Sequence, residues 1–170
     1  MTNEQRRIVT GHDSAGRAIF VADGPTPNVW EAPDGGPVFE LWQHAGVPDN
    51  STEFADPILG QASFPPPRRG SVFRIVDFAP RASGDRIHMH RTRSLDYCYI
   101  IEGSIVAVLD DEERVLKAGD VLVQRGTNHG WRNESGAVCR VLFVLIDAEP
   151  LPAPAEDASR ESVPGIDGAT

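Results

Sequence analysis

Residues 84–103 read GDRIHMHRTRSLDYCYIIEG, a stretch that combines a histidine pair with the residue alternation of a β-strand. His88 and His90 are two positions apart, and residues two apart in an extended chain point to the same side. The pair therefore places two imidazoles on one face, where neutral ring nitrogens bind metals such as Zn, Fe, Ni or Cu. We predict short strands at Ile87–His90 and Asp96–Glu102, the first of which carries a candidate metal-binding pair.

A second informative stretch lies at residues 119–133, which read GDVLVQRGTNHGWRN and contain a third histidine, His129. Taken alone, His129 is readily explained as a solvent-facing loop residue, and Asp96 as a residue at a strand start that caps a backbone amide. Together with His88 and His90, however, they supply three imidazoles and one carboxylate. Such a set suits octahedral Fe, Mn, Ni or Co and, less well, Zn.

The sequence around these stretches is typical of an all-β protein. Apolar segments of strand length recur from residue 71 onward, separated by turns rich in Gly, Asp and Ser. The 16 glycines and 14 prolines among 170 residues suit short strands and tight turns better than long helices. With 40% apolar residues, a chain of this length supports one core. Besides the two strands above, we predict Val72–Phe78, Ile105–Leu109, Arg114–Leu116, Val121–Gln124 and Arg140–Ile146.

Both stretches resemble the sequence motifs of the cupin superfamily. In the first motif a glycine, a His-x-His pair and an acidic residue precede a closing glycine, and Asp96 and Gly103 have the spacing of that family. In the second motif Gly126, His129 and Asn133 match in register. The resemblance covers residues 71–147 and implies a small single antiparallel β-barrel or jelly roll with its site inside the mouth.

The cupin resemblance also implies a cofactor. It implies one divalent metal ion held by His88, His90, Asp96 and His129, with Fe(II) favoured and Mn, Ni, Zn or Co as alternatives. The chain departs from the family pattern at Asp96, where glutamate is usual. Asp96 is therefore expected to bind the metal directly, to bind it through water, or to act as a catalytic base.

Further site residues follow from strand parity. Counted from Asp96, Cys98 shares the inward face while Tyr97 and Tyr99 point outward, so Cys98 is a candidate for contact with a substrate. The alternative is that Cys98 is a small buried hydrophobic residue of the core.

Trp131 and Arg91 complete the candidate substrate contacts. Trp131 lies two residues beyond His129 and is expected to wall the pocket or to fill the core. Arg91 belongs to a basic cluster with Arg86 and Arg93 around the histidine pair. This cluster would attract a carboxylate or phenolate toward the metal, or would form a solvated rim.

The chain divides into three parts by composition. Residues 1–70 are expected to form an N-terminal β-hairpin arm, at residues 7–22, and a long loop over the barrel mouth, at residues 46–69. Residues 71–147 are expected to form the barrel, and residues 148–170, which have little apolar mass, a flexible or loosely draped tail. The resemblance implies a homodimer that pairs through the N-terminal strands, which would also cover an exposed sheet edge.

Charge and hydropathy restrict the partners. A formal net charge of −9 and a pI near 4.9 disfavour nucleic acid and anionic membrane surfaces, and leave a small-molecule substrate as the expected partner. The first residues lack the apolar core of a signal peptide, and no segment approaches the roughly 20 apolar residues of a membrane span. We therefore expect a cytoplasmic protein.

Three functions are compatible with this reading. The favoured one is a metal-dependent enzyme with dioxygenase-like oxidoreductase activity, in which an oxygenated or aromatic metabolite binds the metal and O₂ takes an open position. The second is a non-redox isomerase, decarboxylase, cyclase or lyase that uses the metal as a Lewis acid. The third is a non-catalytic cupin that only binds a small ligand.

Overall fold

The computed structural model describes residues 4–32, 36–60, 64–82 and 84–151. Within these ranges all regular structure is β, as the sequence predicts. The strands are β1 Arg6–His12, β2 Ala18–Pro25, β3 Asn28–Glu31, β4 Pro37–His44, β5 Ser71–Phe78, β6 Ser94–Glu102, β7 Ser104–Val108, β8 Glu113–Lys117, β9 Val121–Arg125, β10 Gly130–Arg132 and β11 Cys139–Asp147. The described residues include no helix long and apolar enough to cross a membrane.

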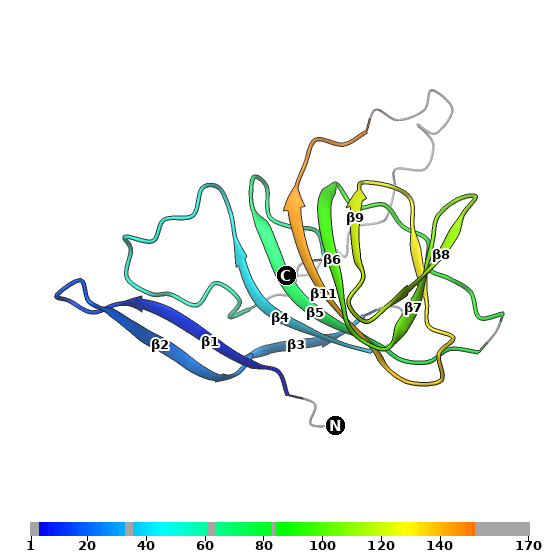
Figure 1. Cartoon of the computed structure of the whole chain (residues 1–170). Helices are drawn as coiled ribbons and strands as arrows, with labels where there is room; N and C mark the ends of the chain where they lie inside the picture. The colour runs from blue at the N-terminus through cyan, green and yellow to red at the C-terminus, as the bar shows by residue number, and fades with distance from the viewer. Residues whose placement is uncertain (1–3, 33–35, 61–63, 83, 152–170) are drawn as a thin grey trace, which may run out of the picture.

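Nine of the strands form two sheets that enclose the core, and β1 and β2 form a separate hairpin (Figure 1). The larger sheet has the order β3-β4-β5-β11-β6-β9 and the smaller one the order β10-β7-β8. Every strand pairing within them is antiparallel. Alternate residues of both sheets pack into one buried cluster, to which Val72 and Val141 contribute from the larger sheet and Ile105 and Trp131 from the smaller one. The predicted all-β barrel is therefore confirmed.

Strand parity in β6 follows the prediction. Cys98 is 1% exposed and belongs to the core, while Tyr97 and Tyr99 are 45% and 44% exposed on the outer face. The inward set of β6 therefore includes Asp96, which is itself buried. The face of β6 that strand parity predicts to be internal is therefore the buried one.

The predicted strand at Ile87–His90 is wrong. Only His90 pairs, in an isolated bridge in which the backbone N–H groups of His90 and His129 donate to each other's carbonyl oxygens at 2.8 and 2.9 Å. The ladder does not continue because the chain after His129 enters β10, which pairs with β7 instead. The two histidines of the pair thus lie in an irregular segment that one bridge attaches to the barrel.

The N-terminal hairpin is confirmed as β1 and β2, joined by a turn in which Asp13 accepts hydrogen bonds from the backbone N–H groups of Ala15 and Arg17. It reaches away from the barrel in Figure 1 and is anchored at its base by an ion pair between Arg7 and Asp56. The described part of the loop at 46–69 has no regular element, as expected. Of the predicted tail, residues 152–170 lie outside the described ranges.

Candidate functional site

A pocket opens on the inner face of the larger sheet and contains about 620 Å³ of empty space, including the part open to solvent. Its walls are mainly apolar and aromatic, and a few polar side chains converge on it, as is usual for small-molecule sites. The aromatic lining residues are Trp30, Phe64, Phe78, Trp131 and Phe143, and the polar ones are Arg74, His88, His90, Thr92, Asp96, Gln124 and His129.

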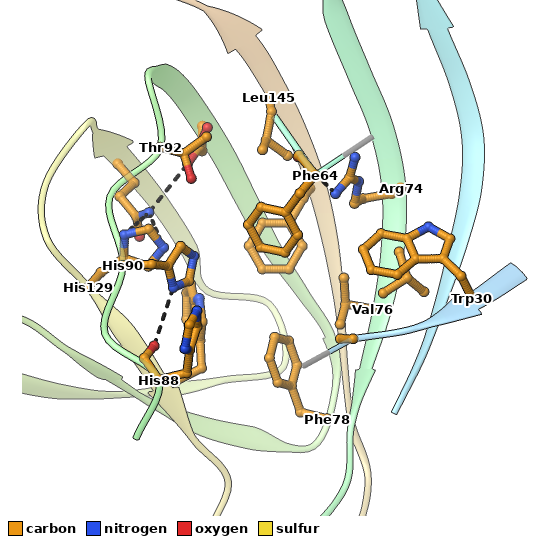
Figure 2. A pocket seen from close by; sticks show the side chains of 16 residues that line it. Trp30, Phe64, Arg74, Val76, Phe78, His88, His90, Thr92, His129 and Leu145 are labelled. Carbon is orange, nitrogen blue, oxygen red and sulfur yellow. Dashed lines mark hydrogen bonds between the residues drawn. The ribbon is translucent and has the colours of Figure 1, made fainter. Parts of the chain in front are cut away.

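The three predicted histidines form one wall of this pocket. Figure 2 shows His88, His90 and His129 side by side, across the pocket from Phe78 and Phe64. The ring centroids of His88 and His90 are 5.2 Å apart, and those of His90 and His129 are 4.2 Å apart. The bridge between His90 and His129 produces this convergence, because it joins the two motif segments at the residues that carry the imidazoles.

Two of the imidazoles are oriented by backbone carbonyls. Nδ1 of His129 lies 2.9 Å from the Thr127 carbonyl oxygen, and Nδ1 of His90 lies 3.3 Å from that of His88. A ring nitrogen that faces a carbonyl oxygen carries the proton, so Nε2 of each ring is left with the lone pair. This is the tautomer in which metal-binding histidines are usually fixed.

Burial sets the charge of the two innermost groups. His129 is 5% exposed, and desolvation lowers the pKa of its imidazole to about 4, so the ring is neutral at physiological pH. Asp96 is 4% exposed, and desolvation raises the pKa of its carboxyl, opposed by the Ser94 hydroxyl and the charge of Arg74. A buried carboxyl with a raised pKa is a candidate for proton transfer.

Gln124 connects these two groups, and the sequence reasoning did not assign it a role. Its side-chain nitrogen lies 3.3 Å from Asp96 Oδ2 and 2.8 and 2.9 Å from the two ring nitrogens of His129. Gln124 stands at the position where the second cupin motif usually has proline, and that substitution was the available signal. Its amide holds the carboxylate of Asp96 beside the imidazole without a direct contact between the two.

The donor groups, as placed, do not form a metal centre. The three imidazoles are suitable in type and tautomer for a divalent metal. Across residues 4–32, 36–60, 64–82 and 84–151, however, no group of three or more His, Cys, Asp or Glu side chains is positioned to hold a metal ion. Asp96 makes its contact with Gln124 rather than with the histidines. The structure therefore brings the four predicted ligands to one pocket without arranging them around a common point.

The predicted substrate contacts differ in their placement. Trp131 lines the pocket and also packs in the core, with its ring 6.2 Å from that of His129 and 5.9 Å from that of Phe78. Cys98 lies in the core and does not line the pocket. Arg91 is exposed and also lies outside the lining. Of these three residues, the structure brings only Trp131 to the site.

A buried ion pair forms the wall opposite the histidines. Arg74 on β5 lines the pocket, and its Nη2 lies 3.0 Å from Oε1 of Glu40 on β4. The two side chains are 3% and 4% exposed. Nε1 of Trp30 donates to the same Glu40 oxygen at 3.1 Å, and the Trp30 ring lies 5.7 Å from the guanidinium carbon of Arg74. Figure 2 shows Arg74 and Trp30 together on this side of the pocket.

These features define a class: a small β-barrel protein with an aromatic-lined pocket, in which three histidines converge beside a buried carboxyl. The family model described as Cupin domain matches residues 74–145. Together with the relatives below, this match shows that the chain belongs to the cupin-domain family.

Two curated relatives from fungi match most of the chain. It is 40% identical over 154 residues to phomopsin biosynthesis cluster protein C' of Diaporthe leptostromiformis, an alignment that covers 85% of this chain and 79% of that protein. It is 36% identical over 164 residues to the cupin-domain-containing oxidoreductase fogC of Aspergillus ruber, with 85% and 73% covered. Among solved structures, an RmlC-like cupin from Shewanella frigidimarina matches with a TM-score of 0.46 and 15% identity, over 71% of this chain and 84% of that one.

Proposed function

We propose that this cupin is an oxidoreductase that acts on a small molecule bound in the barrel pocket. The observation that carries the proposal is the convergence of His88, His90 and His129 on one wall of an aromatic pocket. The name of the fogC protein as an oxidoreductase, at 36% identity, supports the reaction class. Within that class we favour a dioxygenase-like reaction, with O₂ as the oxidant and its atoms entering an oxygenated or aromatic metabolite.

The proposed cofactor is one divalent metal ion, with Fe(II) favoured over Mn, Ni, Zn and Co. Nε2 atoms of His88, His90 and His129 would hold it, provided that the rings turn toward a common point. The bound metal would supply the redox or Lewis-acid chemistry that the side chains of this chain lack.

The residues around the pocket have separate tasks in this proposal. The aromatic walls bind the ligand body and exclude water, and Trp131 and Phe78 pack against each other to shape the inner end. Of the roles considered for Asp96, the contact with Gln124 favours the catalytic base, because Gln124 holds the carboxyl in place at the pocket surface. The proton would move to or from the Asp96 carboxyl.

Elemental analysis tests the proposal. The protein as purified, compared with the His90→Ala/His129→Ala double variant, is expected to contain near-stoichiometric iron that the variant lacks. Zinc, nickel or manganese in place of iron would favour the non-redox isomerase, decarboxylase, cyclase or lyase. Absence of metal from the protein, even after incubation with each ion, would contradict both metal-dependent enzymes and leave the non-catalytic ligand-binding cupin.

A further inference from the structure

The pocket has an unusual charge arrangement for a site lined mainly by aromatic rings. Arg74 is the one cationic arginine or lysine among its lining residues, within the part of the chain that the structure describes. A buried guanidinium beside aromatic rings would ordinarily attract a carboxylate ligand, since it is always charged and presents its donors in a fork. In this protein, however, the Glu40 carboxyl already pairs with the Arg74 guanidinium at 3.0 Å, in the role that a ligand carboxylate would otherwise have.

Both members of the Glu40–Arg74 pair make a further hydrogen bond. Glu40 Oε1 also accepts a hydrogen bond from Trp30 Nε1, while Nη1 of Arg74 donates to the carbonyl oxygen of Phe64 at 3.3 Å. Burial lowers the pKa of the Arg74 guanidinium, and the charges of Glu40 and then of Asp96 oppose that shift. Two acidic groups therefore surround one cation at the pocket wall, and the low-dielectric surroundings strengthen their field.

We propose that Glu40 is a specificity-determining residue: by neutralising Arg74, it makes the pocket accept flat uncharged aromatic molecules and reject aromatic carboxylates. This inference rests on the proposed function in one respect, namely that the substrate binds in this pocket. The walls that Trp30, Phe64 and Phe78 form provide the faces and edges on which a planar ring packs. A carboxylate in the same place would be desolvated close to Asp96 and Glu40 without a free cation to pair with.

Two nearly isosteric probes test this charge selection. Naphthalene-2-carboxamide and naphthalene-2-carboxylate have the same ring and differ in charge at pH 7.5. Calorimetric titration of the full chain, dialysed against a chelator so that bound metal adds no attraction for the anion, gives the ratio of their affinities. We expect the carboxamide to bind at least about tenfold more tightly to the unmodified protein.

The variants separate the role of Glu40 from its effect on folding. Glu40→Gln retains an acceptor for Trp30 and exposes the charge of Arg74, so the affinity ratio is expected to fall to about threefold or less. In Glu40→Gln/Arg74→Gln both charges are removed, and the ratio should return to that of the unmodified protein. This double variant also avoids an unpaired buried charge, which makes it the more stable of the two. Glu53→Gln, at an exposed position of the loop, is the matched control and should leave the ratio unchanged.

Three outcomes would overturn the proposal. They are equal or tighter binding of the carboxylate to the unmodified protein, a tenfold ratio that persists in Glu40→Gln, and absence of binding by both probes. None of these measurements requires metal or turnover. An absence of metal in the elemental analysis would therefore contradict the proposed function while leaving the charge selection by Glu40 to stand or fall on its own.

Discussion

The carbonyl oxygen of Thr127 lies 2.9 Å from Nδ1 of His129. The contact favours a proton on Nδ1, whereas burial opposes a second proton on the ring and lowers the pKa of the imidazole to about 4. The folded state therefore binds a proton at His129 less readily than the unfolded state, whose histidine titrates near 6.5. The resulting stability is fully present above about pH 7 and is lost as the pH falls from 6.5 toward 4.

We accordingly predict that acid destabilises the protein partly through His129. In urea unfolding of the chelator-treated protein, His129→Gln removes this titration, so the unmodified protein should lose up to about 3 kcal/mol more than the variant between pH 7.5 and pH 4. If the two proteins lose stability in parallel over this range, His129 is not the group responsible.

A second prediction concerns the two motif glycines, Gly103 and Gly119, which both have positive φ, at 80° and 95°. A Cβ at Gly103 would lie 2.8 Å from the Val138 carbonyl oxygen and 3.0 Å from Cys139 Cα, whereas one at Gly119 would meet nothing within 4 Å. Alanine at Gly119 should therefore cost about 1–2 kcal/mol of backbone strain alone. Alanine at Gly103 should cost at least about 1 kcal/mol more, because it also displaces β11.

Chemical denaturation of the Gly103→Ala and Gly119→Ala variants measures both values. Equal losses would show that the close approach of β11 at Gly103 adds nothing beyond the backbone conformation.

The fold was largely predictable from the sequence, because alternation in strands such as β6 and β11 directly reflects burial on one face. The short strands β3 and β10 were missed, since four and three residues give too little alternation to recognise. His88 and His90 were placed on one wall correctly but for the wrong reason. Their convergence comes from the bridge to His129, a contact between distant segments that local periodicity does not encode.

The polar part of the site was harder to predict than the histidines. Glu40 lies outside both motifs, and its partner Arg74 alternates with apolar residues in a strand that would otherwise read as core. Only the register of β4 against β5, in which Glu40 pairs with Arg74, places the two side chains together. Sequence motifs thus located the imidazoles, while the charge of the pocket depends on strand pairing.

A third prediction follows from Asn133, the residue that closes the second motif. It is 2% exposed, and its side-chain nitrogen donates to the carbonyl oxygens of Phe78 and Ala137, each at 2.7 Å. Asn133→Ala removes both hydrogen bonds, of which only the one to Ala137 is partly replaced by the Ser135 hydroxyl at 3.1 Å, and should cost about 3 kcal/mol in thermal or urea unfolding. Ser135→Ala removes an exposed hydroxyl that contacts Asn133 and the Ala137 carbonyl, and should cost about 1 kcal/mol or less. A small loss in both variants would mean that water replaces the amide.

The N-terminal arm supports a fourth prediction, on assembly. Phe20 on β2 is 74% exposed, Ile8 on the paired strand β1 is 48% exposed, and the hairpin reaches away from its own barrel (Figure 1). We propose that a second copy of the chain covers this apolar surface in a homodimer.

Light scattering after size exclusion should give the mass of a dimer for the unmodified protein and of a monomer for Phe20→Glu. Val47→Glu, at a loop position that is 91% exposed, should remain dimeric. A monomeric unmodified protein at all concentrations would contradict the proposal.

The last prediction separates the two principal roles of Asp96. A metal ligand and a catalytic base would both be essential for turnover, but only the ligand would be essential for metal content. Because Gln124 holds the Asp96 carboxyl at 3.3 Å, and the three histidines converge on one wall without it, we expect Asp96→Asn to retain most of the metal that His129→Ala loses. Turnover should nevertheless fall about 100-fold or more, the usual loss when a general base is removed.

Gln124→Leu, which releases the carboxyl without removing it, should retain the metal and give an intermediate loss of turnover. Loss of metal from Asp96→Asn as complete as from His129→Ala would instead identify Asp96 as a ligand, and would mean that its contact with Gln124 is replaced when the metal binds.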